Sequence, residues 1–235
     1  MYKGESEAEK IEKVRPISLR VENEIGAFSV EENESGAVKV EIISKDGQRV
    51  LLNDMLPQGY EAIGNKRLWE DPEYAGLYNT DTSLADYRNK TIVVSEQELK
   101  RMEWKYILVF LNELGHTTRN EEHPEEHEEI TTLLNEFYKS SGNEQAEILK
   151  RQELLISQSE RNAWAFAILK FRNIMHELGL SGKDVFGDAA ALKEFIYTES
   201  LRTKAEFAKQ YVGELTIPEE DRQKLVEEIY EMYIH

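Results

Sequence analysis

Hydrophobic and polar positions alternate with a period of two early in the chain. The alternation is seen in AVKVEII (37–43), where every second residue is Val or Ile, within a stretch, 26–52, that predicts strands. KDGQ then supplies a turn at Asp46-Gly47, and RVLL follows. A period of two is typical of half-buried strands, and Asp-Gly between two such runs indicates a hairpin. The pattern therefore predicts strands over 26–52 that are joined by a tight turn.

The apolar spacing changes to three and four in the C-terminal two-thirds of the chain. Ser95 opens SEQE, and Glu98 three residues later completes a capping-box signature, which predicts a helix start at the next residue. We expect this helix to run through LKRMEWKYILVFLNELGH to His116. Before it, residues 53–90 predict loops with short elements, and KTIVVS (90–95) predicts a short strand.

Further helices are predicted after this one. Pro124 followed by two glutamates favours a helix start, a long helix spans roughly 144–178 with Gly179 as its C-cap, and two more cover about 187–211 and 218–233. Strands followed by helices indicate the α+β class rather than a parallel βαβ fold. We expect a flexible tail or short exposed helix over 1–16, a main domain over 17–180 (β-rich over 26–95, helical over 96–178) and a helical appendage over 181–235.

Composition limits the classes of function. The chain has 235 residues, of which 32% are charged, and its formal net charge is −17. Such a chain lacks the basic surface that nucleic acids and anionic membranes require, so we expect neither as a partner. It has no cysteine, which leaves histidines and carboxylates as zinc ligands. The sequence has no signal-peptide core and no apolar run long enough to span a membrane, so we expect a cytoplasmic protein. The sequence does not predict the number of subunits.

The stretch LNELGH (111–116) differs by one residue from the zinc-peptidase motif HExxH. Asn112 stands where the first histidine would be, Glu113 where the base would be, and His116 where the second histidine would be. Positions i and i+4 share a helix face, so two side chains there can reach one ion. The alternative is a helix end that carries Gly and His, which are common at such ends.

Two other segments approach zinc motifs. HELGL (176–180) lacks the second histidine and comes where the long helix ends, so we interpret it as a helix terminus. HPEEH (123–127) matches the inverted motif HxxEH, but Pro124 makes His123 an N-cap and takes it off the helix that would carry His127. We expect neither segment to be a catalytic site.

The stretch SERNAWAFAILKF (159–171) places a carboxylate on an apolar stripe. Burying Glu160 is costly unless a metal, an arginine or a histidine pairs with it. The alternative is an edge position with a salt bridge to Arg161 or Arg172. The apolar residues that share its predicted helix face are Ile156, Trp164, Ala167, Ile168, Phe171 and Met175.

The NELGH helix followed by a helix with E-x-x-A-W-x-F-A resembles the gluzincin metallopeptidases, and within them the ImmA/IrrE-like branch. The resemblance covers about residues 75–178. It implies a zinc site with Glu113 as general base, His116 and Glu160 as ligands, and Asn112 at the first-ligand position. It also implies that the KTIVVS strand before the motif helix is an edge strand, which can hold a peptide or protein substrate by strand addition.

The departure at Asn112 puts zinc binding in doubt, because zinc prefers nitrogen, sulfur or carboxylate ligands to an amide oxygen. Three explanations stay open: an inactive relative that binds a peptide or protein partner, a metal held by His116, Glu160 and a further ligand, or a substitution introduced to trap an inactive enzyme. A helical interaction protein of unrelated origin is the remaining alternative, and it predicts that His116 and Glu160 lie far apart.

Overall fold

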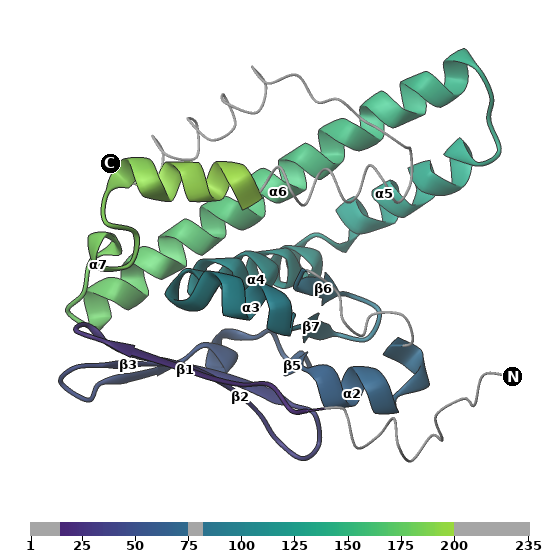
Figure 1. Ribbon diagram of the computed structural model, residues 1–235. Coiled ribbons are helices and arrows are strands. Elements are labelled where there is room, and N and C mark those ends of the chain that lie inside the picture. Colours follow the sequence, from purple (N-terminus) through teal and green to yellow (C-terminus); the bar gives the residue numbers. More distant parts are fainter. Residues whose placement is uncertain (1–14, 75–81, 200–235) are drawn as a thin grey trace, which may run out of the picture. The chain divides into compact units, whose positions relative to one another are not determined.

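The computed structural model describes residues 15–74 and 82–199, and the chain divides into two compact units. The first unit ends at Thr117 and the second begins at Thr118, within helix α4 (Tyr106–Glu122). The strands belong to the first unit, and the described part of the second is helical (Figure 1), which confirms the α+β prediction. The predicted domain boundaries stay predictions. Residues 1–14 of the predicted tail and the helix predicted over 218–233 lie outside the described residues.

Sheet A is a four-stranded antiparallel meander of β1 (Ser18–Asn23), β2 (Gly26–Glu32), β3 (Val38–Ser44) and β4 (Arg49–Leu51). The predicted hairpin is confirmed, because Ile43 pairs with Arg49 across the turn and Gly47 has a φ of +83°. Strand β1 was not predicted. Only Leu19 and Val21 alternate with polar residues there, which is a short signal, and no position of the strand is fully buried.

Sheet B has the strand order β5 (Glu61–Ile63), β7 (Thr91–Val93), β6 (Leu84–Asp86). Strand β7 pairs in parallel with β5 and antiparallel with β6. The prediction that the strand before the motif helix is an edge strand is therefore wrong. All three residues of β7 are buried, as a central strand requires. Strands β5 and β6 are the two outer strands of sheet B. Ile63 of β5 forms a bridge with Ala37, whereas β6 has no second partner among the described residues and is the open edge.

The helix predicted from residue 96 to His116 is broken in the structure. It consists of α3 (Glu96–Met102), the 3-10 turn η3 (Glu103–Lys105) and α4. The break is at Glu103, whose φ of +49° costs an L-residue about 1–3 kcal/mol. The elbow brings the rings of Trp104 and Tyr106 to 6.1 and 6.4 Å from Phe28 of β2, and the burial of these aromatic rings offsets the strain.

The remaining elements agree with the predicted pattern except in detail. Residues 53–90 hold short elements as predicted: η1 (Leu52–Met55), α2 (Asn65–Glu70), η2 (Pro72–Tyr74), and strands β5 and β6. In the second unit α5 (Pro124–Phe137) packs against α6 (Asn143–Glu177), both close to the predicted bounds. Helix α7 (Gly182–Phe186) was not predicted, and residues 189–199 are helical. No helix in the described ranges is long and apolar enough to cross a membrane.

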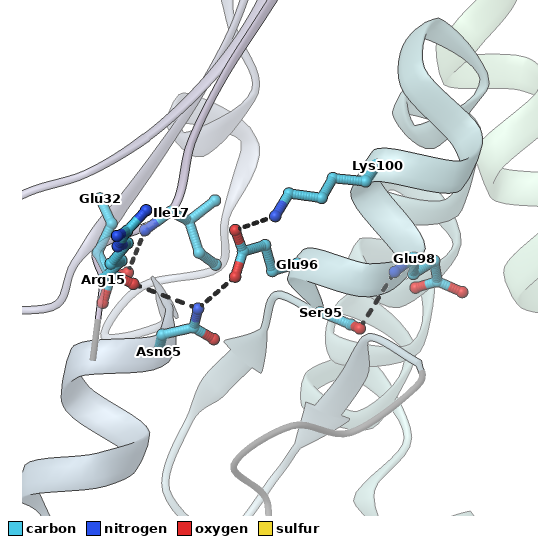
Figure 2. A network of polar contacts seen from close by, with 8 residues as sticks. All are labelled: Arg15, Ile17, Glu32, Asn65, Ser95, Glu96, Glu98 and Lys100. Carbon is cyan, nitrogen blue, oxygen red and sulfur yellow. Dashed lines mark hydrogen bonds and ion pairs between the residues drawn. The ribbon is translucent and has the colours of Figure 1, made fainter. Parts of the chain in front are cut away.

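A buried carboxylate joins sheet A to the start of α2. Glu32 of β2 accepts hydrogen bonds from the backbone N–H of Ile17 at 2.7 Å and of Lys66 at 2.6 Å. Next to it, the Asn65 amide donates to the Glu96 carboxylate at 2.8 Å, at the first turn of α3 (Figure 2). Burial raises the pKa of Glu32 above its ordinary value, and the backbone N–H donors oppose this with a smaller effect.

We expect Glu32→Gln to destabilise the first unit by about 1–3 kcal/mol, because an amide cannot accept both backbone hydrogen bonds. The raised pKa gives this difference a pH dependence. The folded protein binds the Glu32 proton more tightly than the unfolded chain does, so the contribution of Glu32 is full below its unfolded pKa and falls as pH rises through the folded pKa.

Urea unfolding between about pH 4 and 7 measures the effect. The free-energy advantage of wild type over Glu32→Gln should be largest near pH 4 and shrink toward pH 7. The exposed neighbour Glu31 gives the control Glu31→Gln, for which we expect a difference near zero. An advantage that grows with pH would show that the backbone donors, not burial, dominate at Glu32.

Candidate functional site

The motif residues lie in the interior of helix α4. Asn112 and His116 are buried, with 4% and 9% of their surface exposed, and Glu113 between them is partly exposed. The helix continues past His116 to Glu122, so the alternative interpretation of LNELGH as a helix end is wrong. The apolar residues from Ile107 to Leu111 directly before the motif are all buried.

Asn112 carries a buried amide whose nitrogen is not used within the described part of the chain. Its Nδ2 atom is inaccessible to solvent and has no hydrogen-bond partner there. A buried amide without a partner costs about 1–3 kcal/mol, and folded proteins rarely keep one without a reason. The other buried asparagine of the first unit, Asn65, uses its amide nitrogen for two hydrogen bonds. Of the two buried asparagines of the unit, Asn112 is thus the one whose amide nitrogen bonds to nothing in the described ranges.

The chemistry of Asn112 does not fit the zinc site that the gluzincin resemblance implies. Its amide nitrogen carries hydrogens and has no lone pair free for a metal, and its oxygen is a weak zinc ligand. Of Asn112 and His116, which are four residues apart on α4, only His116 has a side-chain atom that is a good zinc ligand. Across the described ranges, no group of three or more His, Asp and Glu side chains is placed to hold a metal ion.

Glu160 lies on the buried face of α6, as predicted, with 6% of its surface exposed. The same face holds the N–H groups of Gln152 and Trp164, which are buried and have no partner among the described residues. Glu160 belongs to the second unit and the α4 motif to the first, so their pairing stays a prediction. The predicted apolar neighbours that are buried are Trp164, Ala167, Ile168, Phe171 and Met175.

The two other near-motifs adopt the structures that we predicted for them. His123 is the N-cap of α5 and lies outside its helix, while His127 is exposed in the helix, so HPEEH does not place both histidines on one helix. HELGL forms the end of α6. There Gly179 has a φ of +66°, and the Leu180 N–H closes the terminus on the Met175 carbonyl at 2.7 Å.

A buried polar network beside the motif was not predicted from the sequence. Glu98 was expected only as part of a capping box, and Ser95 does cap α3. In the structure the Glu98 carboxylate also accepts from the Ser83 N–H at 2.7 Å. The Ser83 hydroxyl accepts from the Ser95 N–H at 3.0 Å and lies 2.6 Å from the Tyr106 hydroxyl. The sequence gives little sign of this network, because a serine outside a helix, such as Ser83, rarely indicates a buried hydrogen bond to a distant segment.

Tyr106, the first residue of α4, is fully buried in this network. Burial raises the pKa of its phenol well above the ordinary range, and the carboxylates of Glu98 and Glu113 add smaller contributions in the same direction. Tyr106 therefore keeps its proton at neutral pH and remains a hydrogen-bonding partner for Ser83. Glu113 follows Tyr106 by seven residues on α4, so the base position of the motif is on the same face of the helix as Tyr106.

Comparisons with protein-family models, with curated proteins and with solved structures found no match. The likeness to gluzincin metallopeptidases stays a prediction that rests on the residues of the two helices.

The two buried asparagines give a matched test of the unused amide. We expect Asn112→Leu, which keeps the branching but removes the polar atoms, to be as stable as wild type or more stable by up to about 1 kcal/mol. Asn65→Leu removes two hydrogen bonds and should cost about 1–3 kcal/mol. Urea unfolding measures both. A loss above about 2 kcal/mol in Asn112→Leu would show that the Asn112 amide is engaged after all.

Proposed function

We propose that this chain is a metallopeptidase-like protein whose zinc site is altered at its first ligand. The observation that carries the proposal is the placement of Asn112 and His116 one turn apart on the buried face of α4, with partly exposed Glu113 between them. This is the arrangement that HExxH chemistry needs, with an amide in place of one imidazole. A surface helix that carried the same letters by chance would have no reason to bury an unused amide.

Glu160 is the proposed third ligand. It is a buried carboxylate on the apolar face of a long helix, at the position that the gluzincin likeness gives to the acidic ligand. The sequence around it, E-x-x-A-W-x-F-A, carries the gluzincin likeness. The partner class that this proposal implies is a peptide or a protein substrate. Nucleic acid is disfavoured by the net charge of −17.

Non-catalytic peptide binding is the second candidate, and the state of Asn112 favours it. Its buried amide is a hydrogen-bond donor, which suits the recognition of a carbonyl or carboxylate oxygen rather than a cation. In the same unit, β6 is an open sheet edge that can accept an extended chain by strand addition. In this form the protein keeps the peptidase architecture and acts as a peptide- or protein-binding module.

Restoring the missing imidazole tests the proposed site. We expect Asn112→His to bind about one zinc per chain, with an affinity higher than that of wild type by on the order of 100-fold or more, because a full ligand replaces a weak one. Zinc content after dialysis and competition with a chromogenic chelator measure it. As a control, Asn135→His adds an imidazole at an exposed position of α5 and should gain nothing.

Two double variants test the remaining ligands. His116→Ala or Glu160→Gln in the Asn112→His background should lower zinc affinity at least tenfold. Glu147→Gln, which changes an exposed glutamate of the same helix α6, should leave it unchanged. If Glu160→Gln behaves like Glu147→Gln, Glu160 is no ligand and the gluzincin proposal fails.

Hydrolysis of fluorescein-labelled casein separates the two candidate functions. If wild type holds stoichiometric zinc and loses activity in Glu113→Gln, it is a peptidase. If wild type holds no zinc, and Asn112→His gains both zinc and casein hydrolysis, the natural chain is a non-catalytic descendant. If Asn112→His gains neither, both candidates are rejected and the helical interaction protein remains.

A further inference from the structure

The open edge of sheet B is too short to hold itself in place. Strand β6 has three residues, Leu84–Asp86, and each faces one residue of β7. A three-residue edge strand makes few ladder hydrogen bonds, and such segments open locally at low cost in free energy. A strand edge that binds a peptide must nevertheless be ordered, because the entropy lost in ordering a mobile strand would reduce the free energy of binding. Something outside the ladder has to fix β6.

Ser83, directly before β6, provides this anchor. Its backbone N–H is held by the buried Glu98 carboxylate of α3, and its hydroxyl joins the N-cap residue Ser95 and the first residue of α4, Tyr106. Three separate elements therefore meet at one serine. Each of these four residues is more than nine-tenths buried, so water does not compete for the bonds.

We infer that Ser83 is a positioning residue: it fixes the open edge β6 relative to helix α4, so that an extended polypeptide added to β6 keeps a constant geometry to Glu113. The nature of the ligand rests on the proposed function, whereas the anchoring of β6 does not. Tyr106 acts through Ser83 in the same role. Tyr106 and Glu113 are seven residues apart on α4 and share a helix face, which places the anchor on the side of α4 that carries Glu113.

Hydrogen exchange tests the anchor directly. In Ser83→Ala and in Tyr106→Phe, amides of residues 84–93 should exchange about tenfold faster, as expected for the loss of one buried hydrogen bond, while amides of sheet A over 26–44 stay unchanged. Ser83→Thr keeps the hydroxyl and should stay within about threefold of wild type. The control Ser35→Ala removes an exposed hydroxyl that bonds Asn33 and should change nothing.

Two results overturn the anchor. Exchange over 84–93 that is unchanged in Ser83→Ala shows that β6 does not depend on Ser83. Exchange that rises equally in sheet A shows a general loss of stability rather than local positioning.

Casein hydrolysis in the Asn112→His background tests the consequence for the ligand. Adding Ser83→Ala should raise KM for fluorescein-labelled casein about tenfold and leave kcat within about twofold, and Ser83→Thr should restore KM. A change in kcat without a change in KM would contradict the proposal that β6 binds the substrate polypeptide. If Asn112→His hydrolyses no casein, the proposed function fails, and hydrogen exchange alone decides the role of Ser83.

Discussion

The buried carboxylate of Glu98 is the interaction on which the region around the motif depends. It lies in the first turn of α3 and holds the backbone of Ser83, whose hydroxyl contacts Ser95 and Tyr106. The open edge of sheet B, the N-terminus of α3 and the start of α4 are thereby tied together. Because a carboxylate this deep is costly to bury without its hydrogen bonds, its contacts favour the observed arrangement of these three elements.

Glu32 and Asn65 join other segments of the first unit in the same way. Glu32 binds the backbone of Ile17, before β1, and of Lys66 in α2, and Asn65 binds Glu96 at the start of α3. Asn112 differs from all of these groups. It is as deeply buried, yet its amide nitrogen bonds to nothing in the described part of the chain. The Nε1 of Trp104 in the same unit is also buried without a partner among the described residues, but the amide of Asn112 lies on the motif face, and departures from polar satisfaction are expected at functional positions.

The sequence predicts the fold best where a local pattern decides the structure. The hairpin at Gly47, the cap at Ser95 and the end of α6 at Gly179 each follow from turn or cap chemistry within a few residues. The break at Glu103 could not be predicted, because the burial of Trp104 and Tyr106 against a distant strand imposes it. The central place of β7 was readable from its unbroken apolar run, since an edge strand alternates.

For the candidate site, helical periodicity places Asn112, Glu113 and His116 correctly on one helix and Glu160 on a buried face. Ser83 could not be found in this way, because its contacts join segments that are distant in sequence. The most direct measurement of the account is the zinc content of dialysed wild type and Asn112→His protein. We predict well below one zinc per chain in wild type and about one in Asn112→His. Asn112→His protein that holds no more than a trace of zinc would contradict the altered-ligand site.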